Sequence, residues 1–279
     1  MKLYNSCYDC LKRLVYQAAE LATDDKRIQE RAIAESLKVL DANFSRDEVS
    51  IVVATKLHDS IKEITQNPDP YREMKDSEIA AAREIYHEVK HTYKNDIRGL
   101  IELAALGNTL DFFRPLDAIR KDMKLGVRFT IDNIQQFEHR LKDASRILYL
   151  ADNAGEVFFD LPLVTLMRQF ASVTYVIKTA PVQNDVTIED IRLAGLEAEL
   201  GDIMSTGTAT PGIDFSLASD EFKREFAAAD LIFAKGMGYY ESLSELEQNG
   251  NIFYCLIAKC QPVADSLGVP LYSFVAMLR

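Results

Sequence analysis

The 279-residue chain has few cysteines, glycines and prolines, and it contains no long apolar run. Its 4 cysteines are too few for a disulfide framework, so we expect free thiols or metal ligands in a reducing compartment. The 12 glycines and 8 prolines exclude a collagen-like or low-complexity chain. No apolar run approaches the roughly 20 residues needed to cross a bilayer, and the opening MKLYNSCYDC lacks the apolar core of a secretory signal. These absences predict a soluble, cytoplasmic protein that folds fully and has no membrane partner.

Basic residues are also in deficit, because 32 Lys and Arg face 43 Asp and Glu and give a formal net charge of -11. A chain of this charge repels a phosphate backbone, so we expect no nucleic-acid partner. Small anionic substrates are compatible with the charge if local cations or a metal reverse the field at the binding site. The sequence leaves the oligomeric state open.

The first third of the chain has the periodicity of helices. Apolar residues recur at steps of three and four in CLKRLVYQAAEL, RAIAESLKVLDANF, EVSIVVATKLHDSIKEIT and SEIAAAREIYHEVKHTYKN. Pro68 and Pro70 interrupt the pattern because proline cannot continue a helix. The helical pattern then runs to Leu106 and is interrupted at Gly107. We therefore expect an α-helical N-terminal lobe over residues 1–106.

From residue 128 onwards, helical patterns alternate with short apolar runs that end in turns. FTIDNIQQFEHRLKDA predicts a helix, and the runs RILYLA, VTYVIK, DLIFAKGMG, NIFYCLIA and VPLYSFVAM predict strands. Thr187, three residues before Asp190, indicates the start of a helix over 188–197. This alternation predicts a three-layer α/β/α domain with a mostly parallel sheet over residues 107–279.

Polar residues follow three of the predicted strands. Asp152 and Asn153 come after RILYLA, Asp185 comes in the loop after VTYVIK, and Lys235 and Gly236 come after DLIFA. The carboxyl ends of parallel strands meet at one edge, where ligands bind. Hard oxygen donors suit Mg²⁺ or Mn²⁺, and a lysine beside a glycine suits a phosphate. The alternative is ordinary turn chemistry, with an acid placed at a helix start by the helix dipole.

Five motifs together resemble one family, the metal-dependent damage-control phosphatases, once called the domain of unknown function 89. These motifs are ADNAGE, the K-x-x-P-x-x-N-D-x-T segment from Lys178 to Thr187, AKGMGYYESL (234–243), GNTLDF (107–112) and DPYREMK (69–75). The resemblance covers nearly the whole chain. Cys7-x-x-Cys10 is similar to the archaeal and bacterial branch, whereas the Arg-Thr-x-Lys motif of the eukaryotic branch is absent.

The resemblance implies a helical lobe over an α/β core and removal of phosphate from sugar phosphates or damaged phosphometabolites. It implies Asp152, Asn153 and Asp185 as ligands of a divalent Mg²⁺, Mn²⁺, Co²⁺ or Ni²⁺ ion, and Lys235 as a phosphate contact. The resemblance further implies three catalytic residues, which are Asp152, Glu156 and Lys235. It also implies four substrate-binding residues, which are Asn108, Asp111, Lys235 and Gly236.

Three points stay open. The family pattern after Lys-Gly usually carries Gly-Asn-Tyr-Glu, whereas here Tyr239 replaces the amide, so the choice of substrate is open. Asp152 is either the nucleophile or only a metal ligand, because a covalent aspartyl-phosphate needs one free carboxylate oxygen in line with the phosphorus. Asn108, next to Gly107, fits a helix C-cap as well as an active-site role.

Two other functions compete with this interpretation. A non-catalytic module could hold a nucleotide or sugar phosphate at the same strand ends. His87-Glu88-x-x-His91 fits the zinc-protease pattern, in which two imidazoles one helical turn apart bind zinc, although charged neighbours indicate a solvated helix face.

The remaining thiols, imidazoles and turns favour structural roles. Cys7 and Cys10 would need Cys255 and Cys260 to complete a four-thiolate zinc site, and we favour packing or adventitious redox chemistry, with Cys255 in the core. We expect His58 and His139 to be surface residues. We expect the turn Asp69-Pro70-Tyr71 to brace the junction between the lobes.

Overall fold

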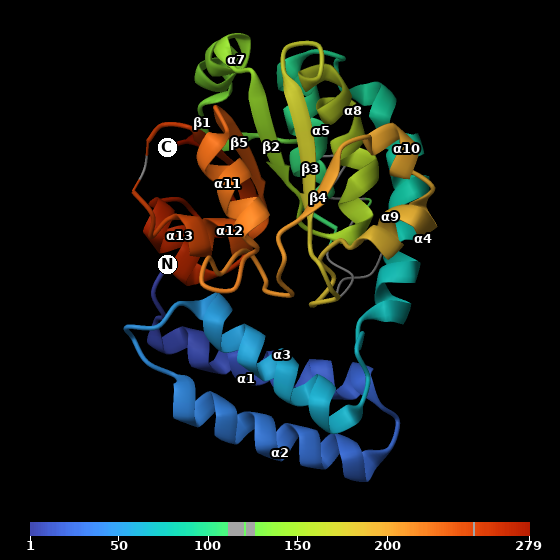
Figure 1. Cartoon of the computed structure of the whole chain (residues 1–279), viewed down its shortest axis with the longest axis vertical. Coiled ribbons are helices and arrows are strands. Elements are labelled where there is room, and N and C mark those ends of the chain that lie inside the picture. The colour runs from blue at the N-terminus through green and yellow to red at the C-terminus, as the bar shows by residue number, and fades with distance from the viewer. Residues whose placement is uncertain (111–119, 121–125, 248) are drawn as a thin grey trace.

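The computed structural model describes residues 1–110, 120, 126–247 and 249–279, and it places a helical bundle beneath an α/β lobe (Figure 1). The bundle consists of α1 (Asn5–Ala22), α2 (Lys26–Asn43) and α3 (Ser50–Thr65). Helix α2 begins after Asp25, whose carboxylate accepts hydrogen bonds from the backbone N–H groups of Arg27 and Ile28. The core of the bundle is a separate apolar cluster of residues such as Leu11, Val15, Leu40, Val53 and Leu57.

Two further helices leave the bundle and run to the sheet. They are α4 (Arg72–Val89), which continues into the 3₁₀ turn η1 (Lys90–Thr92), and α5 (Ile97–Gly107). Their apolar side chains belong to the same core cluster as one face of the sheet. The lobe boundary between residues 106 and 107 stays a prediction, and the two helices that precede it pack on the α/β core.

The sheet has seven strands in the order β1-β7-β6-β5-β2-β3-β4 among the described residues. The strands are β1 (Phe129–Asp132), β2 (Arg146–Leu150), β3 (Ser172–Ile177), β4 (Ile203–Ser205), β5 (Leu231–Lys235), β6 (Ile252–Ile257) and β7 (Phe274–Leu278). All neighbours pair parallel except β6 and β7, which pair antiparallel. The predicted mostly parallel sheet is confirmed, and β2, β3, β5 and β6 end at one edge.

Helices cover both faces of this sheet, as the α/β/α prediction requires (Figure 1). Along β2, Ile147 and Tyr149 enter one core cluster, whereas Leu148 and Leu150 enter the other, because successive strand residues point to opposite faces. The first face is covered by α4, α5, α7 (Ile134–Asp143), α8 (Val157–Met167), α9 (Ile188–Ala194) and α10 (Glu197–Leu200), and the second by α11 (Asp220–Ala228), α12 (Gly236–Leu243) and α13 (Gln261–Leu267).

The structure corrects two predicted helices. FTID is strand β1 rather than the first turn of a helix, and its residues alternate between half-buried and exposed, which is the period of a strand. The predicted helix over 188–197 ends at Ala194, because Gly195 takes the left-handed conformation with φ 73°. Its predicted start is confirmed, since Thr187 and Asp190 form a reciprocal capping box. Within the described residues, no helix combines the length and apolar character that a bilayer crossing requires.

Candidate active site

The two loops that carry the predicted metal ligands lie side by side at the carboxyl edge of the sheet. Asn153 and Asp185 form an antiparallel backbone bridge. The backbone N–H of Val186 donates to the carbonyl oxygen of Asp152 at 2.8 Å, and that of Ala154 donates to the carbonyl oxygen of Asn184 at 2.8 Å. The loop after β2 and the loop after β3 are therefore joined through their backbones, and the structure brings Asp152, Asn153 and Asp185 together.

Two amides link the carboxylates of Asp152 and Glu156. The Nδ2 of Asn108 donates to Asp152 Oδ2 at 3.0 Å and to Glu156 Oε1 at 2.8 Å. The Nδ2 of Asn153 donates to the same two oxygens, at 3.2 Å and 2.6 Å. Asn108 is the C-cap residue of α5, and its Oδ1 accepts from the backbone N–H of Ile257 at 3.3 Å. Asn108 thus combines the C-cap position with side-chain contacts inside the site.

The buried acids at this edge raise one another's pKa. Burial, followed by the charges of Glu156 and Asp185, raises the pKa of Asp152 well above its usual value. Burial also raises the pKa of Asp185 to about 6, against the opposing effect of Lys178. Asp185 is 4% exposed, and its Oδ2 has no hydrogen-bond partner in the described structure. A buried carboxylate oxygen that accepts no hydrogen bond, lies 3.5 Å from its ion-pair partner Lys178 and stands near the carboxylate of Asp152 fits a hard divalent cation.

The ammonium of Lys235 contacts two carboxylates and one backbone carbonyl. Its Nζ is 2.6 Å from Glu156 Oε2 and donates to Asp160 Oδ1 at 2.7 Å and to the carbonyl oxygen of Ala104 at 2.7 Å. Burial alone would lower the pKa of Lys235, but the carboxylates of Asp160 and Glu156 reverse this and raise it. An ammonium has three protons, so a contact with phosphate would require Lys235 to give up one of these partners.

Asp160 was missed from the sequence, although one signal was present. It stands inside the apolar run VFFDLPLV and is fully buried, and a buried acid needs partners. The structure supplies them, because the hydroxyls of Tyr149 and Tyr175 donate to Asp160 at 2.7 Å and 3.0 Å, beside Lys235. This buried network holds Lys235 and, through it, Glu156.

Two other lysines face the site. The Nζ of Lys178 donates to the hydroxyl of Tyr239 at 3.0 Å and to the carbonyl oxygen of Gly212, and it lies 3.5 Å from Asp185 Oδ2. Lys259 directly follows the strand-end run NIFYCLIA, and its charge lowers the pKa of Asp152 against the effect of burial. The rule that predicted Lys235 from its strand end could have found Lys259 too. Lys259 is half-buried, and within the described residues its ammonium has no hydrogen bond or ion pair.

Glycine at position 236 allows Asp152 to approach the start of α12. Gly236 has φ 75°, and a Cβ there would lie 1.9 Å from Asp152 Oδ2. The backbone at Gly236 therefore lies close to the Asp152 carboxylate, which is at the amino end of α12, where the helix dipole favours negative charge.

Glu78 on α4 also reaches the site, and sequence reasoning missed it. Its Oε1 accepts from the backbone N–H of Gly155 at 3.3 Å, and its Oε2 accepts from Asn184 Nδ2 at 3.1 Å. Burial raises the pKa of Glu78 to about 8. No sequence signal separates this residue from a solvated helical glutamate, because its partners lie more than 70 positions away.

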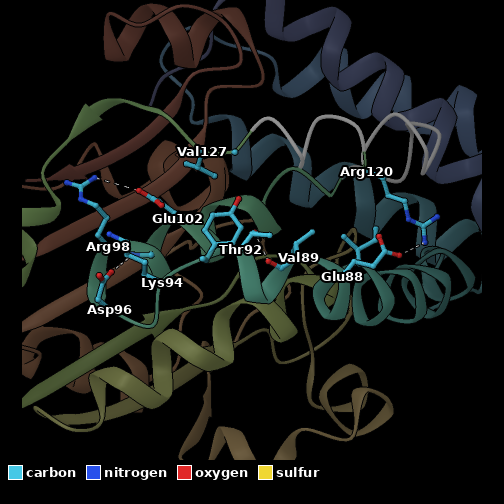
Figure 2. Close-up of a pocket in the computed structure, with 13 residues that line it drawn as sticks. Glu88, Val89, Thr92, Lys94, Asp96, Arg98, Glu102, Arg120 and Val127 are labelled. Carbon is cyan, nitrogen blue, oxygen red and sulfur yellow. Dashed lines mark hydrogen bonds and ion pairs between the residues drawn. The ribbon is translucent and has the colours of Figure 1, made fainter.

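A separate pocket of about 620 Å³ lies at the opposite end of α5 (Figure 2). Figure 2 shows two ion pairs in its wall, Arg98 with Glu102 at 3.9 Å and Arg120 with Glu88 at 3.4 Å. Asn108 caps one end of α5, whereas Arg98 and Gly99 lie in the first turn at the other end. The pocket is therefore distinct from the edge that carries Asp152 and Asp185.

The zinc-protease pattern does not form one helical face. Helix α4 ends at Val89, so His87 lies on the α-helix and His91 lies in the 3₁₀ turn. Both imidazoles are exposed, and the carboxylate of Glu88 pairs with Arg120. Over the described ranges, no three His, Cys, Asp or Glu side chains are placed to hold a metal ion together, whereas the predicted site has two carboxylates and an amide.

The remaining predictions concern Asp111, the four cysteines and two histidines. Asp111 lies outside the described residues. All four cysteines are free, and Cys255 is buried in the core as predicted. His139 is exposed as predicted, but His58 is only 1% exposed, which contradicts the surface prediction. His58 was misjudged because α3 turns this polar position towards the ring of Tyr71, with ring centroids 5.8 Å apart.

The turn Asp69-Pro70-Tyr71 is linked to the α/β lobe through Lys75, whereas its role as a brace between lobes stays a prediction. The buried Nζ of Lys75 lies 2.9 Å from Asp69 Oδ2 and 3.2 Å from Asp190 Oδ2. Asp190 caps α9, so this lysine connects the turn after α3 to the loop that carries Asp185.

Known proteins are similar to this chain over almost its full length. A family model described as "Damage-control phosphatase ARMT1-like domain" matches residues 3–275. A damage-control phosphatase from Pyrococcus horikoshii is 34% identical over 283 residues, covering 99% of this chain and 98% of that protein. A damage-control phosphatase from Archaeoglobus fulgidus is 33% identical, with 99% of each chain covered. The crystal structure of a Pyrococcus horikoshii protein of the domain of unknown function 89 family matches with a TM-score of 0.91 at 33% identity, covering 100% of this chain and 99% of that one.

Proposed function

This chain belongs to the damage-control phosphatase family, and on that premise we propose that it is a metal-dependent phosphatase that hydrolyses phosphomonoesters of small metabolites. The substrates we propose are sugar phosphates or damaged phosphometabolites. The observation that supports a metal-dependent site most directly is the buried Oδ2 of Asp185, which accepts no hydrogen bond in the described structure and lies in a loop bonded to the Asp152–Asn153 loop.

Asp152, Asn153 and Asp185 would hold the cation, which we propose to be Mg²⁺, Mn²⁺, Co²⁺ or Ni²⁺. When bound, such an ion polarises a phosphoryl oxygen and neutralises charge that develops during hydrolysis. The all-oxygen donor set supports a hard cation over one that prefers thiolate or imidazole. Each hydrogen bond that the Asp152 carboxylate accepts in the described structure goes to Oδ2, so Oδ1 is the oxygen left for a cation or for attack on phosphorus.

Lys259 and Lys235 have different roles in this proposal. Lys259 attracts the anionic phosphate, because its charge acts on the Asp152 carboxylate and its ammonium has no hydrogen bond or ion pair among the described residues. Its backbone N–H donates to Met237 Sδ at 3.2 Å, which places it against the first turn of α12. Lys235 positions Glu156, because its ammonium forms an ion pair with Glu156 and is itself held by hydrogen bonds to Asp160 and the carbonyl oxygen of Ala104.

The test is release of phosphate from p-nitrophenyl phosphate by protein stripped of metal and then given each cation in turn. We expect turnover only with a divalent cation, and we expect Asp152→Ala to abolish it, because the variant loses a ligand and a candidate nucleophile. Asp143→Asn changes an exposed acid at the end of α7 and should leave turnover unchanged. Near-normal turnover in Asp152→Ala would refute the site.

The same assay separates a non-catalytic binding module, which would bind a phosphate ester without turnover. A panel of sugar and nucleotide monophosphates, each with several cations, then identifies the substrate class.

A further inference from the structure

One face of α4 holds both loops of the candidate metal site. Lys75 and Glu78, three residues apart on the helix, are both fully buried and point to the same side. Glu78 Oε1 accepts from Gly155 N–H at 3.3 Å, in the loop after β2. Glu78 Oε2 accepts from Asn184 Nδ2 at 3.1 Å, in the loop after β3. One carboxylate therefore connects the two ligand-bearing loops to a single helix.

The loop after β3 is fixed at two points that flank Asp185. Asn184, which directly precedes Asp185, is bound by Glu78. Asp190, five residues further on, is bound by Lys75 at 3.2 Å. The segment between these anchors cannot shift relative to α4 without breaking a buried hydrogen bond or ion pair, and such losses are costly.

Close packing also joins α4 to the loop after β2. A Cβ on Gly155 would lie 2.7 Å from Glu78 Cγ and 3.1 Å from Ala82 Cβ, so α4 touches the backbone of this loop. Gly155 stands two residues after Asn153 and directly before Glu156. The position of α4 therefore determines where the amide of Asn153 and the carboxylate of Glu156 lie.

We infer that Glu78 is a positioning residue that sets the metal affinity of the site by holding the Asp152–Asn153 loop and the Asp185 loop in register. This inference rests on the proposed function. Glu78 acts through Gly155 and Asn184 rather than as a ligand, since its carboxylate oxygens bind their N–H groups. Partners of metal ligands typically change metal affinity by about 10–100-fold when they are altered.

A double-mutant cycle between Glu78 and Asn184 tests the inference. Glu78→Gln turns one acceptor into an N–H₂ group that opposes a donor, and Asn184→Asp faces the Glu78 carboxylate with a second one. The double variant Glu78→Gln/Asn184→Asp restores a donor opposite an acceptor, with the direction of the hydrogen bond reversed. Glu73→Gln alters an exposed glutamate of the same helix and is the matched control.

Two readouts use protein without substrate. Calorimetric titration with Mn²⁺ should give about 10–100-fold weaker binding for each single variant, substantial recovery in the double variant, and no change in Glu73→Gln. Amide hydrogen exchange of the metal-free protein should be faster over residues 182–190 in Glu78→Gln and slower again in the double variant. If Glu78→Gln does not fold, Asn184→Leu removes the whole side-chain amide of Asn184, including the donor to Glu78, and should also weaken Mn²⁺ binding.

The outcomes separate this inference from the proposed function. Wild-type Mn²⁺ affinity in folded Glu78→Gln or Asn184→Leu, or a loss that the double variant does not recover, would overturn the positioning role while leaving the metal site intact. A wild-type protein that binds no Mn²⁺ and hydrolyses no phosphate ester would overturn both.

Discussion

At the residue scale, the buried acids of the site are not all fully hydrogen-bonded. Lys235 is held by Glu156 and Asp160, whereas the Oδ2 of Asp185 has no hydrogen-bond partner in the described structure. A buried carboxylate oxygen that accepts no hydrogen bond costs free energy, and such sites often serve binding or catalysis. This oxygen is therefore the strongest residue-scale argument for a bound cation.

Residues at strand ends were predictable, and residues on helices were not. Asp152, Asn153 and Asp185 follow apolar runs, so the topology of a parallel sheet predicts their meeting. Glu78 lies on an amphipathic helix, where the sequence does not tell which face meets a loop that lies far along the chain. His58 failed for the same reason, because α3 buries it although it reads as a surface residue.

His58 provides a pH-dependent prediction for stability. Burial lowers its pKa from 6.5 to about 3, with a smaller contribution from the charge of Lys62. Below pH 6.5 the unfolded chain binds a proton at this imidazole while the native protein does not, so stability falls as pH falls from 6.5 towards 3. Between pH 7.5 and 5.5 the linkage amounts to about 1.4 kcal/mol.

His58→Phe should remove this part of the slope. Urea unfolding at pH 7.5 and 5.5 should show wild type losing about 1.4 kcal/mol more than the variant. At pH 7.5 we expect the variant to be at least as stable as wild type, because both ring nitrogens of His58 lack partners in the described structure. Equal losses in the two proteins would contradict the burial of a neutral imidazole.

At the element scale, the secondary structure of a short segment depends on the strand with which it pairs. FTID resembled the start of the helix that follows it, but pairing with β7 makes it a strand. β4 has three residues and no period of its own, so only its pairing with β3 identifies it. Longer elements, such as α1 and β6, carry enough periodicity to be predicted from sequence alone.

The junction between β5 and α12 yields an element-scale prediction. Gly236→Ala adds a Cβ 1.9 Å from Asp152 Oδ2, and the short side chain of Asp152 can rotate away from it. We therefore expect a modest loss of stability, about 1–2 kcal/mol for a left-handed residue, together with loss of at least most phosphatase activity. Thermal melting and p-nitrophenyl phosphate turnover measure the two effects.

Gly195→Ala is the matched control for this junction. Gly195 has φ 73°, and a Cβ there meets nothing within 4 Å. The variant should lose a similar amount of stability and keep its activity. Equal activities in the two variants would show that the contact between Gly236 and Asp152 is unimportant.

At the scale of the whole molecule, the layers were predictable but their docking was not. Alternating strands and helices predict the α/β/α lobe, and helical periodicity predicts the helices before it. The placement of the bundle depends on specific contacts, such as Ser50 Oγ with Glu241 and Lys62 Nζ with the carbonyl oxygen of Pro181. Such contacts join the surfaces of separate elements, and the periodicity of each element does not predict which surfaces will meet.

The charge at the site also affects the stability of the whole fold. Burial and the charges of Glu156 and Asp185 raise the pKa of Asp152, so the metal-free protein favours a neutral group there. Asp152→Asn should therefore melt above wild type in EDTA, by about 2–4 °C for each kcal/mol of relief in a chain of roughly this size. Wild type should gain about 2.7 kcal/mol from free Mn²⁺ at 100 times its dissociation constant, and the variant should gain little. The two melting temperatures should thus cross as Mn²⁺ is added, because the carboxylate that destabilises the metal-free fold is the one that binds the ion. A variant that melts below wild type in EDTA, or that gains as much from Mn²⁺, would remove Asp152 from the metal site.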